Sequence, residues 1–184
     1  DAFGGLDGTG QANGDGRGGS ATITVSGATP AGVASSLSGG AMNVHANGYG
    51  AFPSSGPDVA DTGGAGFGGN AAIRVQNGGS LSTTAGVTVE ANGRGGFGLV
   101  QSGNGTGGTA EIDAAGTGVT LQAGTVAINA TGIGGGGLAV DPTLGARPSQ
   151  NGGDGTGGTA TLRFRAIGTS TISLGDTTLD VSGT

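Results

Sequence analysis

Two glycine-rich stretches, "GDGRGGSATITV" at 14–25 and "GDGTGGTATLRF" at 153–164, carry residue types that could hold a phosphate. Closely spaced glycines let backbone N–H groups approach an anion, but a dinucleotide loop follows a strand and opens a helix. Here a strand-like alternating stretch comes directly after the glycines, and no Lys-Ser/Thr pair follows them. The spacing therefore favours tight turns and close backbone packing, so we expect no cofactor and no cofactor-binding residues.

The same loops raise the question of calcium. "NGGDGTGGTA" at 151–160 has the glycines of calcium-binding solenoid repeats but lacks their later Asp. The variable position of the four loops holds, in order, Asp15, Ala65, Asn104 and Asp154, so two loops lack a carboxylate. We therefore predict no specific metal site, and keep weak binding at Asp15 or Asp154 as an alternative.

Catalytic chemistry has few candidate residues. The chain has one His, no Cys, no Trp and no Lys. Polysaccharide lyases and hydrolases need paired carboxylates or a basic residue beside the substrate. Glu111 and Asp113 share a strand face, but the repeat described below places Arg74 and Arg163 beside Asp113. We expect no catalytic residues and no enzymatic activity.

The composition limits the partners. The net charge is -6 and the six basic residues, all Arg, are spread along the chain, which argues against nucleic acid because phosphate binding needs clustered positive charge. No apolar run approaches the roughly 20 residues of a membrane span. The chain begins at Asp1 without a signal-peptide pattern, and we interpret it as a segment of something larger.

An internal repeat organises the whole chain. The pattern Gly-x-Gly-x-Gly-Gly-(Ser/Asn/Thr)-Ala begins at Gly14, Gly64, Gly103 and Gly153. A second landmark follows each one and ends in glycine: "NVHANG" at Gly48, "TVEANG" at Gly93, "AINATG" at Gly132 and "LDVSG" at Gly183. The segments between the landmarks are nearly constant, except for an insertion near "ATPAGVASS", whereas the glycine tracts between them vary in length. Constant cores with variable connections are typical of stacked units whose insertions emerge as loops.

Inside each core the apolar residues alternate with period two, which predicts half-buried strands. After the first landmark the inward positions are Ala21, Ile23 and Val25, and their equivalents in the next cores. The second landmark alternates in the same way, and a third short apolar piece, such as "GVTL" at 118–121 or "STISL" at 170–174, lies between them. Three short strands with tight turns fit one coil of a three-sided solenoid.

We therefore predict an all-β fold, a parallel β-solenoid of four coils with glycine-rich loop insertions. Residues 1–184 form a single repeat unit with coil cores at about 19–48, 69–93, 108–132 and 158–183. The twist of parallel crossovers favours a right-handed coil. The outward positions then form columns along the axis, and two of these carry charge: Thr24, Arg74, Asp113, Arg163; and His45, Glu90, Asn129, Asp180.

The two ends of the chain fit this repeat as well. With Thr184 read as followed by Asp1, Phe3 stands four residues after Gly183, as Phe97 stands four residues after Gly93. We therefore expect one period of a longer array, built by tandem repeats or by copies of the chain stacked end to end. Such stacking covers strand edges that are otherwise prone to pair with other chains. At a junction His45 would lie between Glu90 and Asp180, and protonation of His45 is expected to strengthen the contact.

The repeats, typified by "GNGTGGTAEIDAAGTGVTLQAGTVAINATG", resemble those of large bacterial surface proteins, the filamentous-haemagglutinin-like and autotransporter-type β-solenoids. This resemblance implies an extracellular, cell-surface protein with adhesion, matrix or filament roles and a host or matrix surface ligand. We expect a structural building block of an extracellular bacterial filament. The alternatives are a stalk segment of a large secreted adhesin and, less favoured, a polysaccharide-active enzyme or an ice-binding protein. The last of these would need regular Thr columns, which charged residues interrupt.

Overall fold

The structure, a computed structural model, describes residues 1–3, 14–27, 34–51, 62–98, 100–136 and 151–184. Every regular element among these residues is a β-strand. The predicted insertion near 28–36 and the tracts between the coils lie wholly or partly outside the described residues. The strands are β1 Ala2–Phe3, β2 Gly16–Arg17, β3 Ser20–Ser26, β4 Ser36–His45, β5 Gly48–Tyr49, β6 Gly66–Phe67, β7 Asn70–Gln76, β8 Ser80–Glu90, β9 Gly93–Arg94, β10 Gly105–Thr106, β11 Thr109–Thr117, β12 Thr120–Asn129, β13 Gly132–Ile133, β14 Gly155–Thr156, β15 Thr159–Ile167 and β16 Thr171–Asp180.

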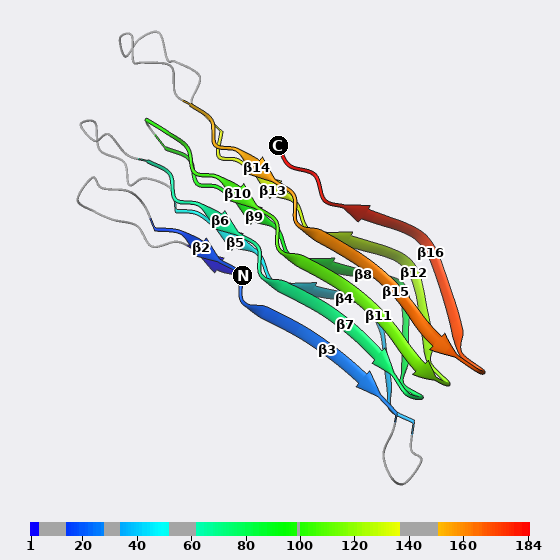
Figure 1. The fold of residues 1–184 in the computed structure, drawn as a ribbon. Helices are drawn as coiled ribbons and strands as arrows, with labels where there is room; N and C mark the ends of the chain where they lie inside the picture. The colour runs from blue at the N-terminus through cyan, green and yellow to red at the C-terminus, as the bar shows by residue number, and fades with distance from the viewer. Residues whose placement is uncertain (4–13, 28–33, 52–61, 99, 137–150) are drawn as a thin grey trace.

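The strands repeat in groups, and each group forms one coil. Coil 1 contains β2 to β5, coil 2 β6 to β9, coil 3 β10 to β13, and coil 4 β14 to β16. Equivalent strands pair in parallel and form four sheets along the axis (Figure 1). We number them in chain order: sheet 1 (β2-β6-β10-β14), sheet 2 (β3-β7-β11-β15), sheet 3 (β4-β8-β12-β16) and sheet 4 (β1-β5-β9-β13). The predicted parallel β-solenoid of four coils is confirmed.

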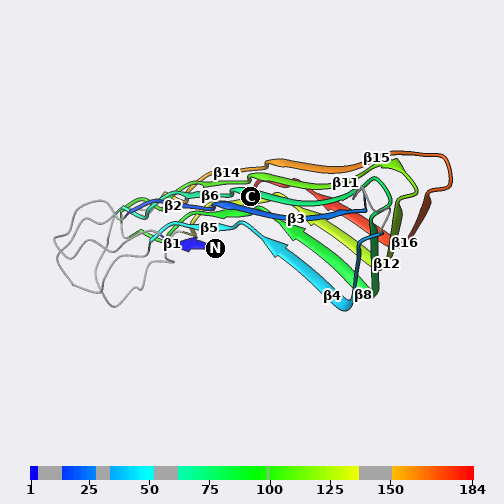
Figure 2. The same cartoon turned by 90° about the horizontal axis from the view of Figure 1, so that it is seen from below.

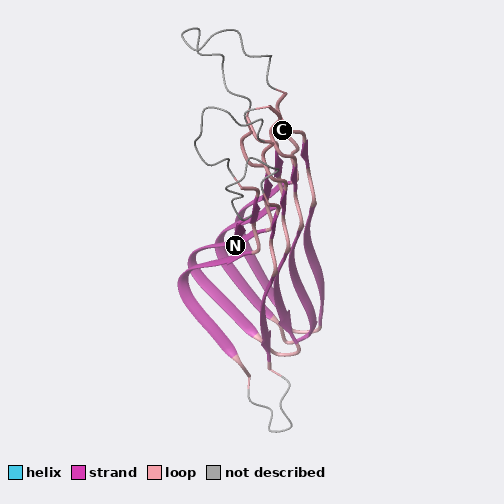
Figure 3. Cartoon of the chain, turned by 90° about the vertical axis from the view of Figure 1, so that its left-hand side faces the viewer, coloured by secondary structure: helices cyan, strands magenta, loops and turns pink. Residues whose placement is uncertain are grey.

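The coil is right-handed and encloses a wedge. Viewed from below (Figure 2), the chain runs clockwise around the solenoid axis while it moves away from the viewer. Figure 1 shows the same right-handed path from the front. Sheets 2 and 3 diverge to form the wide part of the wedge, and the short strands of sheets 1 and 4 form its thin part (Figure 2). Within each of sheets 2 and 3, the long strands of successive coils lie side by side, so the sheets extend along the solenoid axis (Figure 3).

The hydrophobic core lies between sheets 2 and 3, in the columns that the alternation predicts. Ile23, Ile73, Ile112 and Leu162 occupy one register position of sheet 2. The two members from the middle coils, Ile73 and Ile112, are fully buried, as are Leu81 and Leu121 of sheet 3. Equivalent aliphatic side chains therefore stack on one another from coil to coil, and the core is continuous along the axis.

Sheet 3 differs from the expected pair of separate strands. The third apolar piece and the second landmark belong to one strand in each coil, as in β12, which runs from the last two residues of "GVTL" through "QAG" to "TVAIN". The register shifts between Ala123 and Thr125 and between Gly39 and Ala41. A bulge lets a strand bend while its pairing continues on both sides. Each strand of sheet 3 therefore supplies two sides of the three-sided coil (Figure 2).

Sheets 1 and 4 explain the glycine content. A Cβ on Gly105 of sheet 1 would stand 2.0 Å from the carbonyl oxygen of Ile133 in sheet 4, and a Cβ on Gly132 would stand 2.0 Å from that of Thr156. Real Cβ atoms do not approach backbone this closely. The two sheets therefore pack backbone against backbone, and this layer is formed by the second glycine of each first landmark and the final glycine of each second landmark.

One buried hydroxyl in the core is without a partner. Thr83 of β8 is 5% exposed, and its Oγ1 has no hydrogen-bonding partner in the described structure. An unsatisfied buried hydroxyl costs about 1–3 kcal/mol. We expect Thr83→Val, which keeps the shape of the side chain, to raise the free energy of unfolding by about 1 kcal/mol.

Urea unfolding followed by circular dichroism measures this change. The matched control is Thr84→Val at the next residue, whose side chain is exposed and whose replacement should change little. Lower stability of the Thr83→Val variant would contradict the assignment of a hydroxyl without a partner.

Candidate assembly interface

The variable position of the glycine loops connects neighbouring coils through its side chains. Asp15 Oδ1 accepts a hydrogen bond from the backbone N–H of Ala65 at 2.9 Å, and Asn104 Oδ1 accepts one from the N–H of Asp154 at 2.9 Å. Each of these oxygens thus bonds the equivalent residue of the next coil. Within the described ranges, no three His, Asp or Glu side chains gather as ligands for one metal ion.

The charged column of sheet 2 has the predicted register but different partners. Asp113 pairs in register with Arg74 and with Arg163, as the repeat predicts. It is Glu111, however, that lies between these two arginines, with N···O distances of 3.6 Å to each. The predicted position of Asp113 between Arg74 and Arg163 is therefore confirmed by the register, but both arginines form their ion pairs with Glu111. Long Arg side chains reach diagonally to the acid two residues earlier on the neighbouring strand.

Asp113 follows the same diagonal rule with Arg165, which the sequence reasoning missed. The Asp113 side chain is 5% exposed, and Arg165 donates through Nε to Oδ1 and through Nη2 to Oδ2. This hydrogen bond and the charge of Asp113 raise the pKa of the Arg165 guanidinium. Glu111 and Asp113, the two acids on one face, are thus both engaged with arginines.

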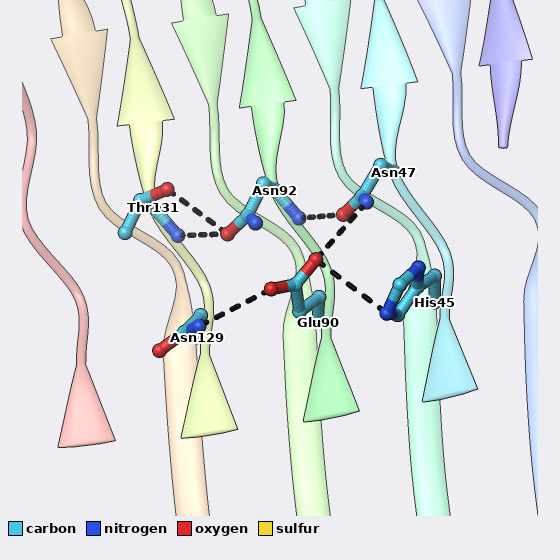
Figure 4. A network of polar contacts seen from close by, with 6 residues as sticks. All are labelled: His45, Asn47, Glu90, Asn92, Asn129 and Thr131. Atoms are coloured by element: carbon cyan, nitrogen blue, oxygen red, sulfur yellow. Dashed lines mark hydrogen bonds and ion pairs between the residues drawn. The ribbon is translucent and has the colours of Figure 1, made fainter. Parts of the chain in front are cut away.

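The second charged column, on sheet 3, is centred on Glu90 (Figure 4). His45 Nε2 lies 3.7 Å from Glu90 Oε2, and Asn129 Nδ2 donates to Glu90 Oε1 at 3.4 Å. Asn47 also donates to Glu90, at 3.5 Å. The column joins three successive coils, and its fourth member by register is Asp180 of coil 4.

A ladder of side-chain oxygens runs beside this column (Figure 4). Asn47 Oδ1 accepts from the N–H of Asn92 at 2.7 Å. Asn92 Oδ1 accepts from both the N–H and the hydroxyl of Thr131, each at 2.9 Å. This ladder carries the coil-to-coil bonding around the corner between sheets 3 and 4. Its signal in the sequence is the Asn before the glycine in "HANG" and "EANG".

At the two ends of the solenoid, side chains whose equivalents are buried in the middle coils are exposed. Leu179 of coil 4 is 48% exposed, whereas Ile128, which occupies its place in coil 3, is fully buried. Phe164 and Val181 of coil 4 are exposed in the same way. At the other end, Leu37 of coil 1 is 36% exposed, and Leu81 in its place in coil 2 is fully buried. Among the described residues, coil 4 therefore presents several apolar side chains beside an outer strand edge, and coil 1 presents Leu37 beside the opposite edge.

The ends complement each other when the register is continued from coil 4 to a following coil 1. Leu174 then faces Gly39, so a large side chain meets a position with none. Asp180 faces His45, and the Asp154 carboxylate faces the backbone N–H of Asp15, the arrangement that Asn104 and Asp154 already show. Packing, charge and hydrogen bonding all continue in this register.

The N-terminal residues do not take the register that is predicted when Asp1 is read as following Thr184. Ala2 pairs with Gly48 and Phe3 with Tyr49 in sheet 4, so Phe3 takes the register position of Thr184, not one four residues after Gly183. The physical reason is the open edge of β5, with which Ala2–Phe3 pair. The rings of Phe3 and Tyr49 stack with their centroids 5.0 Å apart.

The described part of the chain contains no helix with the length and apolarity of a membrane span. Comparison with protein-family models, with curated proteins and with solved structures finds no match to this chain.

Proposed function

We propose that the chain is a structural building block of an extracellular bacterial fibre, in which copies stack end to end through parallel β-strand pairing. The observation that carries this proposal is the match between the two ends. Coil 4 exposes the apolar columns that coil 1 continues, in one register across sheets 2 and 3. The resemblance of the repeats to bacterial surface solenoids supports the extracellular location.

Physical chemistry favours a neighbour at each end. Among the described residues, the outer edges of β15 and β16 at one end, and of β3 and β4 at the other, have no strand paired with them, and Leu179 and Leu37 are exposed there. Edges of this kind pair readily with other chains unless they are protected. Because the two surfaces differ, the contact is heterologous, and repeating it generates an open filament.

The same stacking within one long chain would give the stalk of a large adhesin. In such a tandem chain Asp1 of one repeat would follow Thr184 of the repeat before it. A mass measurement on the native material separates the two, since separate copies give units of 16.9 kDa.

Sedimentation of the purified chain at increasing concentration tests the proposal. We expect a series of species at multiples of 16.9 kDa that lengthens with concentration and is elongated. A single monomeric species throughout the concentration range, or a closed dimer that does not grow, would contradict end-to-end stacking.

The charged pair across the junction predicts a dependence of stacking on pH. His45 would face Glu90 of its own chain and Asp180 of the neighbour. A protonated imidazole attracts both carboxylates, so protonation of His45 is expected to strengthen stacking. In the Asp180→Asn variant this dependence should be reduced, because Asn keeps the oxygen that accepts from the Ser182 N–H but loses the charge.

Sedimentation at several pH values measures this effect. Asp176→Asn on the same strand is the control, since the register places Asp176 opposite Ala41. A wild-type chain that stacks equally well over the whole range, or an Asp180→Asn variant with an undiminished response, would rule out the contact between His45 and Asp180.

A further inference from the structure

Sheet 4 contains one more register position than the other three sheets. At its first end, Ala2 pairs with Gly48, and the Ala2 N–H donates to the carbonyl of Asn47 at 2.9 Å. At its other end, Gly183 pairs with Gly132, and the Gly134 N–H donates to the carbonyl of Thr184 at 2.7 Å. In the part of the chain that the structure describes, sheets 1, 2 and 3 have one strand from each of the four coils and no further strand.

The two end segments occupy equivalent positions. The register runs from Gly48 through Gly93 and Gly132 to Gly183, so Ala2 stands in the position of Gly183 in a coil that would precede coil 1. When coil 4 of one copy stacks on coil 1 of the next, sheet 4 has space for one strand between β13 of the first copy and β5 of the second. Residues 1–3 of one copy and 182–184 of the other both fit that space by register.

We propose that residues 1–3 are a displaceable cap on the edge of sheet 4, and that end-to-end stacking replaces them with residues 182–184 of the neighbouring copy. This inference rests on the proposed stacking. The stacked state then keeps Gly183 in the shared position and releases Phe3 from Tyr49. In the single chain, the cap covers the edge of β5.

The close packing of sheets 1 and 4 favours residues 182–184 over residues 1–3 in the shared position of sheet 4. At Gly48 a Cβ would meet the carbonyl oxygen of Phe67 at 2.0 Å and that of Gly16 at 2.6 Å, one in the following coil and one in the same coil. The equivalent position at a junction is enclosed on both sides, because sheet 1 continues through the junction. Gly183 fits such a position, whereas Ala2 carries a Cβ. Coil 1 already covers Ala2 on the side where Gly48 has its closer contact, and a junction would add the carbonyl oxygen of Gly155, which a Cβ on Gly183 would meet at 2.4 Å.

The connections of the chain favour the same outcome. Residues 182–184 follow directly from β16, which itself pairs at the junction, and they are held by hydrogen bonds to Gly132 and Gly134. Residues 1–3 are held by a two-residue strand and by the ring stack, with Phe3 75% exposed. Displacing residues 1–3 therefore breaks fewer contacts than displacing residues 182–184.

A reversible covalent lock on the cap tests this inference. The chain has no Cys, so the Phe3→Cys/Tyr49→Cys double variant introduces the only two thiols, at positions paired in register. Neighbouring parallel strands lie about 4.8 Å apart, within the Cα separations that disulfides span. The matched control is Arg94→Cys/Ile133→Cys, a pair inside sheet 4 whose disulfide leaves the cap free.

Sedimentation of both variants, oxidised and reduced, gives the readout. We expect the oxidised cap variant to remain a single chain and to stack after reduction, while the control stacks in both states. If the oxidised cap variant stacks as well as its reduced form, the inference is overturned. If neither the wild-type chain nor the control stacks, the proposed function itself fails, and the displacement that rests on it fails too.

If the cap variant stacks neither oxidised nor reduced even though the wild type stacks, a deletion variant tests the inference. A chain lacking residues 1–3 has no cap to displace, so it should stack several-fold faster than the wild type. Slower or lost stacking of this variant would overturn the inference. Near-ultraviolet circular dichroism of Tyr49, the single tyrosine, reports the loss of the Phe3 ring in the wild-type chain as it stacks and in the deletion variant.

Discussion

A Gly105→Ala substitution is expected to destabilise the solenoid by more than about 3 kcal/mol, the upper end of the usual range for overpacked cores. The new Cβ would stand 2.0 Å from the carbonyl oxygen of Ile133 and close to the other backbone atoms of that residue. Both backbones are fixed by parallel pairing to the coils on either side, so neither can retreat without breaking its sheet. Gly105 is not among the glycines with positive φ, so the effect is steric.

Urea unfolding of the variant measures the loss, as a lower midpoint with an unchanged slope. Gly136→Ala is the matched control, because a Cβ there meets nothing within 4 Å and the residue also lacks a positive φ. The control should stay within about 0.5 kcal/mol of the wild type. Equal stabilities of the Gly105→Ala and Gly136→Ala chains would show that sheets 1 and 4 are not packed backbone against backbone.

The second large effect is expected at the junction and not in the fold. A Cβ on Gly69, Gly108 or Gly158 would meet the carbonyl oxygen of the equivalent glycine one coil earlier, at 2.0–2.1 Å. Gly19 is the first member of this series, and a Cβ there meets nothing within 4 Å, because no coil precedes it in the single chain. In a stack, the preceding position belongs to Gly158 of the neighbour.

Gly19→Ala should therefore leave the single chain folded and strongly weaken stacking. If the clash at the junction costs about 3 kcal/mol, as in an overpacked core, the affinity between copies falls about a hundredfold. Sedimentation measures the affinity and urea unfolding the stability, with Gly136→Ala as the control for both. A Gly19→Ala chain that stacks like the wild type would mean that coil 4 does not contact coil 1.

The sequence predicts sheets 2 and 3 well, because their side chains alternate between core and solvent. The period of two at Ala71, Ile73 and Val75 identifies both the strand and its buried face, and the glycine landmarks set the register between coils. Columns of equivalent residues follow directly from that register. The same reasoning predicts that Asp180 of one copy faces His45 of the next, which the proposed stacking still has to test.

Other features leave weaker signals. Sheets 1 and 4 pack through glycine backbone, which has no apolar alternation to detect, so their two-residue strands read as loops. Register alone places Asp113 opposite Arg74, but the reach of an Arg side chain decides that Glu111 is the partner. Arg165 was missed for the same reason, since Ala115 is the residue directly opposite it. The placement of Phe3 depends on an open edge, which only the assembled coil reveals.

Fibre diffraction from the assembled chain tests the central claim most directly. Four coils at about 4.8 Å predict an axial repeat of roughly 19 Å, together with a strong reflection at about 4.8 Å along the fibre axis. These two spacings on the same axis would mean that coil 4 of each copy stacks on coil 1 of the next. A strand spacing perpendicular to the fibre axis, or an axial repeat unrelated to four strand spacings, would contradict end-to-end stacking.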